Sequence, residues 1–223
     1  MITASTLRFL DDLALNNDKE WFDANRVRYE NDVKAPFRSL VSSLIDTICM
    51  ADMQYHCTPQ QAVFRINRDT RFSKDKRPYK TNLAAAIGPG GRKGSPSFYV
   101  HLEPATLMIG GGAYAVTPEQ LVQVRRYVTR HPDALPRAVA DEAFASFYGD
   151  VLGETNKVLP LAFRDAAGTP YLANKQWYFM KEMPSADLLR APDQVMMLFD
   201  AFLAARPVNA VLRAALEESE VRP

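Results

Sequence analysis

The sequence predicts an α+β protein with a helical N-terminal third, an antiparallel strand-rich middle and a helical C-terminal part. In the first third, apolar residues recur every three or four positions, as on one face of an α-helix. After Pro59 the period changes to two, and glycine and proline separate short segments, as in an antiparallel sheet. Helical spacing returns after Thr117. With no linker or internal repeat, this order predicts a single domain over residues 1–223.

Three helices are predicted in the N-terminal third. The first begins at Thr6 and carries leucines three positions apart. Asn17 precedes Glu20 by three positions, which predicts the N-cap and capping box of the second helix. Pro36 suits the first turn of the third helix. The apolar face of this third helix is the most regular in the sequence and consists of Phe37, Leu40, Val41, Leu44, Ile45 and Ile48.

Two strands are predicted on either side of a long basic segment. Residues 62–67 alternate, which places Phe64 and Ile66 on the core face and Arg65 and Asn67 on the other. Residues 82–87 form the second strand. The residues between them lack a regular period, and we expect an ordered loop there.

A hairpin is predicted farther along the chain. Residues 98–103 alternate, with Phe98, Val100 and Leu102 expected in the core and Tyr99, His101 and Glu103 on the other face. Residues 106–109 are expected to return as the partner strand, and the glycines at 110–112 to end it. We expect this hairpin and the strand through Arg65 to share one sheet, with Arg65 and His101 on the same face.

The C-terminal half is predicted to be mainly helical. Thr117-Pro118 with Gln120 is a strong helix start. Residues 155–163 and 171–180 have strand-like composition, and Ser185 or Asp187 is expected to cap a further helix. Pro192 and Pro207 are each expected to begin one of the last two helices.

The overall composition excludes several classes of protein. A net charge of +1 and a pI near 7.8 argue against general nucleic-acid binding, which usually involves a globally basic domain. Cys49 and Cys57 are too few for a disulfide framework and are expected to be reduced. Acidic residues interrupt the N-terminus before an apolar run develops, so a signal peptide is not expected. No apolar segment approaches the roughly 20 residues of a membrane span. These features predict a cytoplasmic protein that does not associate with membranes.

Residues 65–82 concentrate positive charge. This segment has seven basic residues and two acids, a local charge of +5 in a chain whose total is +1. Such concentration favours an anionic partner, and guanidinium groups can bind phosphate or carboxylate through two hydrogen bonds. We therefore expect an anionic small molecule to be the ligand. The residues expected to bind it are Arg65, Arg68, Arg71, Lys76, Tyr79, Lys80 and Asn82.

A structural interpretation of the same segment stays open. Asp69 can neutralise only one or two arginines, and we expect Asp69 and Arg68 to form a structural pair. Arg71, Lys76 and Lys80 would then face the ligand. Phe72 and Tyr79 are expected either to stack on a ligand or to anchor the loop in the core.

Catalytic signals are weak. His101 shares a predicted strand face with Glu103, and Asp69 lies in the basic segment, so these three are the candidate proton carriers. A satisfied polar sheet face is the competing explanation for His101. His56 and Cys57 lack the spaced partners of a zinc site, so no metal site is predicted, and no cofactor can be assigned. The phosphate-binding loop and nucleophile-elbow motifs are absent from the sequence.

The basic segment resembles the hallmark of the family catalogued as domain of unknown function 2461. That hallmark reads Arg-x-x-Arg-Asp-x-Arg-Phe-x-x-x-Lys-x-Pro-Tyr-Lys-x-Asn, and the chain matches it at Arg65, Arg68, Asp69, Arg71, Phe72, Lys76, Pro78, Tyr79, Lys80 and Asn82. The similarity extends upstream to Asn16-Asn17, Trp21-Phe22 and Asn25-Arg26, and downstream through Tyr99–Pro104 and the three glycines. Pro160–Phe163 departs from the family, whose members more often carry glycine before the phenylalanine. The resemblance implies no function, because the family has none assigned.

Three functions therefore remain open from the sequence. The first is binding of a phosphate-bearing or other anionic ligand through residues 65–82. The second is an enzyme that acts on a phosphorylated substrate or nucleotide. The third is a structural or interaction module in which the basic segment forms an internal ion-pair scaffold.

Overall fold

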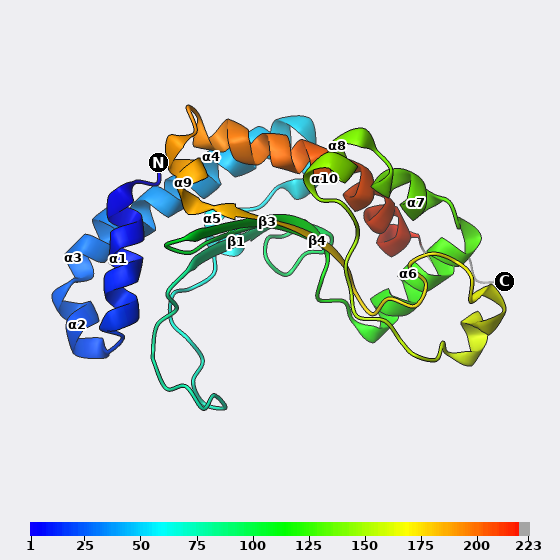
Figure 1. Cartoon of the computed structure of the whole chain (residues 1–223), viewed down its shortest axis with the longest axis horizontal. Helices are drawn as coiled ribbons and strands as arrows, with labels where there is room; N and C mark the ends of the chain where they lie inside the picture. The colour runs from blue at the N-terminus through cyan, green and yellow to red at the C-terminus, as the bar shows by residue number, and fades with distance from the viewer. Residues whose placement is uncertain (219–223) are drawn as a thin grey trace. The chain divides into compact units, whose positions relative to one another are not determined.

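The computed structural model describes residues 1–218 as two compact units. Unit 1 comprises Met1–Lys93, Tyr99–Ile109 and Glu182–Asp200, and unit 2 comprises Gly94–Phe98, Gly110–Lys181 and, among the described residues, 201–218. An antiparallel sheet of four strands in the order β1-β2-β3-β4 lies in the middle of the chain, with helices before and after it (Figure 1). The predicted α+β class is thus confirmed. The single-domain organisation stays a prediction.

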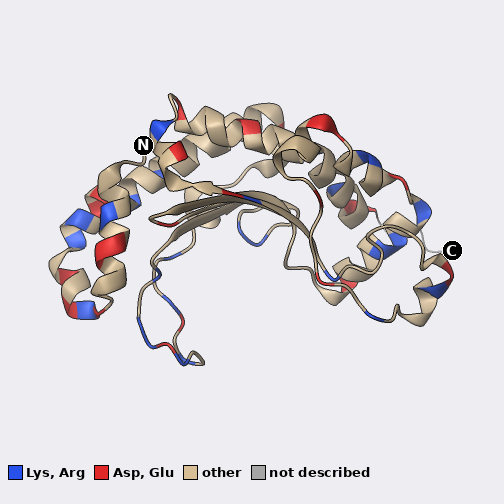
Figure 2. Cartoon of the chain, viewed as in Figure 1, with Lys and Arg blue, Asp and Glu red and all other residues tan. Residues whose placement is uncertain are grey.

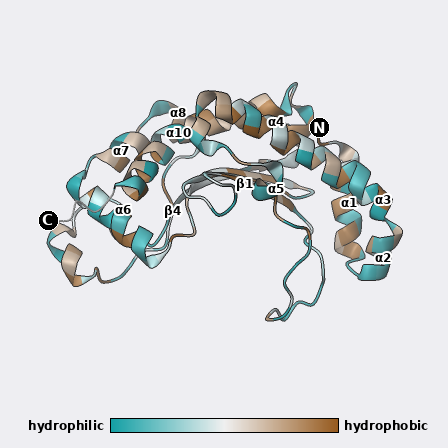
Figure 3. Cartoon of the chain, turned by 180° about the vertical axis from the view of Figure 1, so that it is seen from behind, coloured by the Kyte–Doolittle hydropathy of each residue, from teal (hydrophilic) through white to brown (hydrophobic). Residues whose placement is uncertain are grey.

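Unit 1 begins with a nearly continuous series of helices. Its elements are α1 (Ala4–Leu15), α2 (Lys19–Ala24), α3 (Arg26–Tyr29), the π-helical turn η1 (Glu30–Lys34), α4 (Ala35–Ala51), the 3-10 turn η2 (Met53–Tyr55) and α5 (Pro59–Ala62). All six residues of the predicted apolar face of α4 are buried, and α4 packs against β1 (Figure 1). In Figure 3 hydrophobic positions recur along α4.

Two predicted helix starts are wrong by a few residues. Thr3 is the N-cap of α1, and Thr6 is the buried third residue that completes the capping box. Asp18, rather than Asn17, is the N-cap of α2, and its carboxylate accepts a hydrogen bond from the Trp21 amide at 2.9 Å. The side chain of Asn17 makes a different contact, described below.

The four strands are β1 (Leu83–Ile87), β2 (Ser97–Leu102), β3 (Thr106–Ala113) and β4 (Trp177–Pro184). Phe98, Val100 and Leu102 are buried as predicted. The glycines at 110–112 continue β3 instead of ending it. A Cβ on Gly110 would lie 2.3 Å from the carbonyl oxygen of Phe179 in β4, so the close approach of the two strands requires glycine there.

Residues 62–67 do not form the predicted regular strand. They pair with the rest of unit 1 only through isolated bridges, Val63 to Ala85 and Asn67 to Tyr79. The predicted core position of Phe64 is wrong, because its ring packs edge-on against Tyr99 at 6.4 Å, on the face of β2 opposite Val100. The side chains of residues 62–67 do not alternate strictly between two faces, because the segment has no continuous partner strand. After α5 the chain is bridged to β1 only at Val63 and then enters the basic loop.

Unit 2 contains α6 (Pro118–Arg130), α7 (Ala134–Val139), α8 (Glu142–Phe147) and the 3-10 helix η3 (Leu161–Ala166). The predicted capping box at Thr117 is present. The predicted strand at 155–163 is wrong, because only an isolated bridge from Thr155 to Asn174 forms there. Trp177, Phe179 and Phe144 lie at the centre of the unit 2 core.

The last two helices are α9 (Ser185–Arg190) and α10 (Gln194–Glu217). Pro207 lies inside α10, so the predicted break is wrong, and the buried residues Val208 and Leu212 extend the helix across it. The continuous helix is long and apolar enough to cross a membrane by length and composition. From Ala204 onward the helix contributes buried residues to the core of unit 2, as core helices of globular proteins do.

Candidate functional site

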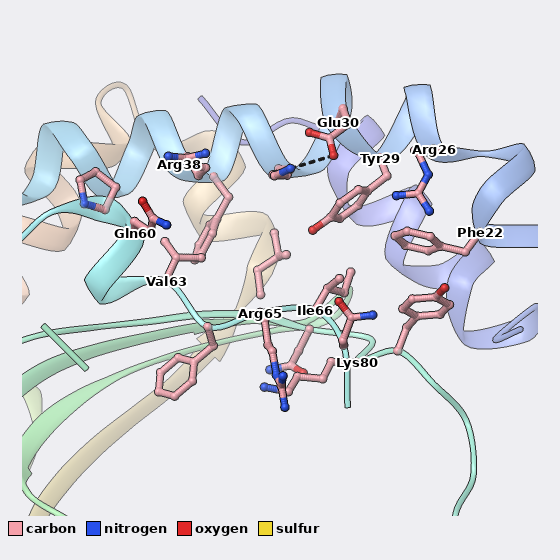
Figure 4. Close-up of a pocket in the computed structure, with 18 of the residues that line it drawn as sticks. Phe22, Arg26, Tyr29, Glu30, Arg38, Gln60, Val63, Arg65, Ile66 and Lys80 are labelled. Atoms are coloured by element: carbon pink, nitrogen blue, oxygen red, sulfur yellow. Dashed lines mark hydrogen bonds and ion pairs between the residues drawn. The ribbon is translucent and has the colours of Figure 1, made fainter. Parts of the chain in front are cut away.

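The candidate site is a pocket of about 550 Å³ within unit 1 (Figure 4). One wall comes from the helices α2, α3, η1 and α4, and the other from the chain segments 59–67 and 79–83. Its lining contains one acidic residue, Glu30, and six basic residues. The basic residues are Arg26, Lys34, Arg38, Arg65, Lys80 and Arg92.

The helical wall depends on an i+4 repeat in the sequence. Arg26, Glu30, Lys34 and Arg38 are each four residues apart and all line the pocket. Residues four apart share one face of a helix. The π-helical turn at Glu30–Lys34 lies in the middle of this run, and such turns are frequent at functional sites. Tyr29 belongs to the same wall, and its hydroxyl points into the space between α4 and the extended chain (Figure 4).

Three of the six cations have structural partners. Arg26 forms a very short ion pair with Asp23, and Lys34 pairs with Glu30 at 2.8 Å. Arg92 donates to the carbonyl oxygens of Gln60 and Gln61 at 3.0 and 2.9 Å. Arg26 and Lys34 are thus paired with carboxylates, and Arg92 is held by neutral carbonyl oxygens.

The other three cations, Arg38, Arg65 and Lys80, have no ion-pair partner among residues 1–218. Arg38 comes from α4, whereas Arg65 and Lys80 come from the opposite wall (Figure 4). Lys80 is half-buried, and its ammonium lies over the Phe64 ring at 5.4 Å. Burial lowers the pKa of Lys80, and the nearby charge of Arg65 lowers it further. The pocket therefore presents positive charge that no carboxylate of residues 1–218 neutralises.

Tyr79 anchors the second wall to the helices. Its main-chain N–H donates to Asn17 Oδ1 and its carbonyl oxygen accepts from Asn17 Nδ2, both at 3.0 Å. Its ring stacks on Phe22 with centroids 4.0 Å apart. Tyr79 is buried, so the anchoring role is the one that the structure supports. The Asn17 clamp explains how Lys80 is positioned opposite α3 and α4.

Much of the predicted basic site lies outside the pocket, in the loop 68–78 (Figure 2). Arg68 pairs with Asp75 at 2.7 Å, and Asp69 pairs with Arg71 at 2.7 Å. The predicted Arg68–Asp69 pair is therefore wrong. The loop folds back so that a carboxylate seven residues away reaches Arg68, which sequence adjacency cannot reveal.

The tip of this loop is exposed. Phe72 is 95% exposed and does not line the pocket, so the expectation that it anchors the loop in the core is wrong, whereas stacking on a ligand stays a prediction. Lys76 donates to the carbonyl oxygen of Thr70 at 3.0 Å. Figure 3 shows the loop as mostly hydrophilic. Its ion pairs fit the scaffold interpretation for residues 68–77.

These contacts predict different roles for the two loop carboxylates. Asp75 accepts from Arg77 and Arg68 and from the Arg77 amide, and these bonds hold its pKa well below the usual range. Asp69 binds only Arg71, two residues away. We expect Asp75→Ala to accelerate tryptic cleavage after Arg71 and Lys74 clearly, and Asp69→Ala to change it little. Equal acceleration by both variants would contradict this assignment.

His101 lies at the centre of a polar cluster on β2. Its Nε2 is 2.9 Å from Glu103 Oε1, and its Nδ1 is 2.9 Å from the Tyr99 hydroxyl. Asn82 Nδ2 lies 3.2 Å from the same Nδ1. Asn82 also lines the pocket, so the cluster adjoins it. The third candidate proton carrier, Asp69, is bound to Arg71 and does not line the pocket.

The structure thus gathers part of the predicted site and adds residues that the sequence analysis missed. Arg65, Tyr79, Lys80 and Asn82 line the pocket, whereas Arg68, Arg71 and Lys76 do not. The missed residues come from the helical wall. They are Arg26, Lys34 and Arg38, whose i+4 spacing was the available signal, and Tyr29, which lies outside that spacing. Within residues 1–218, no group of three or more His, Cys, Asp or Glu side chains is placed to hold a metal ion.

Comparison with known proteins gives the family. A family model described as conserved hypothetical protein (DUF2461) matches residues 5–210 of the 223. The chain belongs to the DUF2461 family. The match to DUF2461 includes every residue that lines the pocket. Searches of curated proteins and of solved structures found no match.

Proposed function

We propose that the protein binds a phosphate-bearing or other anionic small molecule in the unit 1 pocket. The observation that carries this proposal is that Arg38, Arg65 and Lys80 line one pocket and have no carboxylate partner among the described residues. Guanidinium and ammonium groups are the usual protein partners of phosphate and carboxylate. An anion placed beside them would supply the missing countercharge.

The energetics of Lys80 support an anionic ligand. Burying a charged group without a partner is unfavourable, and the lowered pKa of Lys80 reflects both that burial and repulsion from Arg65. A bound anion would stabilise the charged form of Lys80 and offset the repulsion from Arg65, and so would raise the pKa of Lys80 again. The pocket size, about 550 Å³, falls in the range of roughly 300–1,000 Å³ that is typical of small-molecule sites.

Tyr29 adds a neutral hydrogen-bond donor to the helical wall. Burial, with a smaller contribution from Glu30, raises its pKa to about 12. Its hydroxyl therefore keeps its proton at neutral pH and can donate to an anionic oxygen. Because the donor carries no charge, it also suits a ligand whose anionic group is joined to a polar, uncharged part.

In this proposal, some residues of the basic segment bind the ligand and others stabilise the loop. Arg65, Lys80 and Asn82 serve the ligand together with Arg38, whereas the residues of the loop 68–77 bind mainly one another. The proposal keeps the cytoplasm as the expected location, since Cys49 and Cys57 are both free thiols.

A ligand panel tests the proposal. We expect inorganic phosphate, pyrophosphate, nucleotides and sugar phosphates to include compounds that raise the melting temperature, while matched neutral analogues leave it unchanged. A ligand present at about a hundredfold over its Kd adds roughly 2.7 kcal/mol. For a chain of this size that amounts to a shift of roughly 5–10 °C. A panel with no selective shift would contradict the proposal.

The lowered pKa of Lys80 predicts proton uptake on binding. Lys80 loses its proton at a lower pH than an exposed lysine, and a bound anion raises its pKa again. Binding is therefore expected to take up protons between the lowered pKa and about 10.4, the ordinary lysine value. Below that window Lys80 is charged in both states and no uptake is expected.

Calorimetric titrations at alkaline pH in two buffers of different ionisation enthalpy measure this uptake. In Lys80→Arg the uptake should disappear while affinity persists, because the guanidinium stays charged. Equal heats in both buffers for the wild-type protein throughout the window would show that Lys80 does not contact the anion.

A further inference from the structure

We propose that Tyr99, His101 and Glu103 form a proton relay at the edge of the pocket, and that the protein performs acid–base chemistry on its anionic ligand. The inference rests on the proposed function, because the ligand bound by Arg65 and Lys80 becomes the substrate. Its class is a phosphorylated small molecule with an acidic proton, either on a hydroxyl group or on a carbon next to a carbonyl.

The geometry of His101 carries the inference. One ring nitrogen faces a carboxylate and the other a hydroxyl, each at 2.9 Å. This is the arrangement of a base that a third group orients and that withdraws a proton from a hydroxyl. The His101 side chain is only 16% exposed, whereas Glu103 is 45% exposed. The relay thus runs from the more exposed Glu103 through the sheltered His101 to the half-buried Tyr99.

Two contacts connect the relay to the pocket. Asn82 lines the pocket and lies 3.2 Å from His101 Nδ1. Phe64 also lines the pocket; it packs against Tyr99 on one side and lies beneath the Lys80 ammonium. Tyr99 does not itself line the pocket, but its ring and the cation that would hold the anionic group both contact Phe64.

A proton transfer along this relay balances without any co-reactant. The substrate X–H bond breaks and its proton goes to Tyr99 Oη, while the phenolic proton moves to His101 Nδ1. The electron pair stays on X, and the imidazolium that forms is paired with Glu103 through Nε2–H. Lys80 and Arg65 lie where they can stabilise the negative charge on the substrate. Return of the proton to a different atom gives an isomerisation, and loss of a leaving group gives an elimination.

Tyr99 is the catalytic residue in this scheme, while His101 and Glu103 act through it. Such general acid–base groups contribute about 10²–10⁴-fold to rate. Tyr99→Phe keeps the ring that packs on Phe64 and removes only the hydroxyl. It is expected to lower kcat by about 10²–10⁴-fold with ligand affinity unchanged. His101→Gln is expected to lower kcat with little effect on KM, a split that loss of a merely structural contact would not produce.

The experiment uses the full chain and phosphorylated compounds from the panel that bind by calorimetry. Each is incubated with the protein in D₂O and followed by proton and phosphorus NMR for deuterium exchange or product. Tyr114→Phe is the matched control, because Tyr114 is an exposed tyrosine outside unit 1. We expect exchange or turnover with at least one compound, its loss in Tyr99→Phe, and wild-type rates in Tyr114→Phe.

The outcomes separate the two proposals. Binding without exchange or turnover for every bound compound would overturn the relay and leave the binding function standing. Turnover that survives in Tyr99→Phe would also overturn it. If no panel compound binds, the proposed function fails and the relay fails with it.

Discussion

Replacing Arg65 and Lys80 together with methionine is expected to weaken the binding of a phosphate-bearing ligand by about 10²–10⁴-fold. A hydrogen bond to a charged group contributes roughly 1.5–3 kcal/mol, and the double variant removes two such donors from one pocket wall. Methionine preserves most of the apolar length of both side chains. Calorimetric titration with the panel compound that gives the largest thermal shift measures the loss.

The matched control is the double variant Arg71→Met/Lys76→Met, which removes the same two residue types from the exposed loop. Neither residue lines the pocket, so affinity should stay within a few-fold of wild type. The pocket variant should also melt no lower than wild type. Burial and the charge of Arg65 both disfavour the charged form of Lys80, and the substitutions remove these unfavourable terms. If the control loses as much affinity as the pocket variant, the ligand binds at the loop and the pocket assignment is wrong.

Asn17→Ala is expected to destabilise the protein by about 2–5 kcal/mol. The side chain satisfies both the N–H and the carbonyl of Tyr79, a buried residue, and truncation leaves both main-chain groups without a partner. Each unsatisfied buried group costs about 1–3 kcal/mol. Urea denaturation monitored by circular dichroism measures the change.

Asn16→Ala is the control for this prediction. Asn16 is the neighbouring exposed residue, and its side chain donates only to the carbonyl of Asp12 at the end of α1. Its replacement should change stability by no more than about 0.5 kcal/mol, as is usual for surface substitutions. A similar loss in both variants would mean that the Asn17 clamp on Tyr79 contributes little.

Elements that depend on local pattern were predictable from the sequence. The buried face of α4, the alternation in β2 and the capping box at Thr117 follow from the spacing of residues close together in the chain. Pro207 misled the prediction because packing in the core of unit 2 outweighs the helix-breaking tendency of one proline. Residues 62–67 misled it because alternation in composition does not guarantee a partner strand along the whole segment.

The candidate site was predictable only in part, for a related reason. The basic hallmark located Arg65, Lys80 and Asn82, but the opposite wall comes from helices some 40 residues earlier in the chain. Nothing local to Arg38 indicates that it lines the same pocket as Lys80. Charge counting also treated all seven bases alike, whereas the folded loop pairs Arg68 with Asp75 and Arg71 with Asp69. Which cations remain without a partner is a property of the tertiary structure.

The most direct test of the anion pocket is an anomalous diffraction experiment on crystals soaked in selenate, a tetrahedral anion that resembles phosphate. The account predicts an anomalous difference peak inside the unit 1 pocket, within hydrogen-bonding distance of Lys80 Nζ and the Arg65 guanidinium. Selenate peaks confined to the loop 68–78 or to the outer surface of the helices, with the pocket empty, would contradict it.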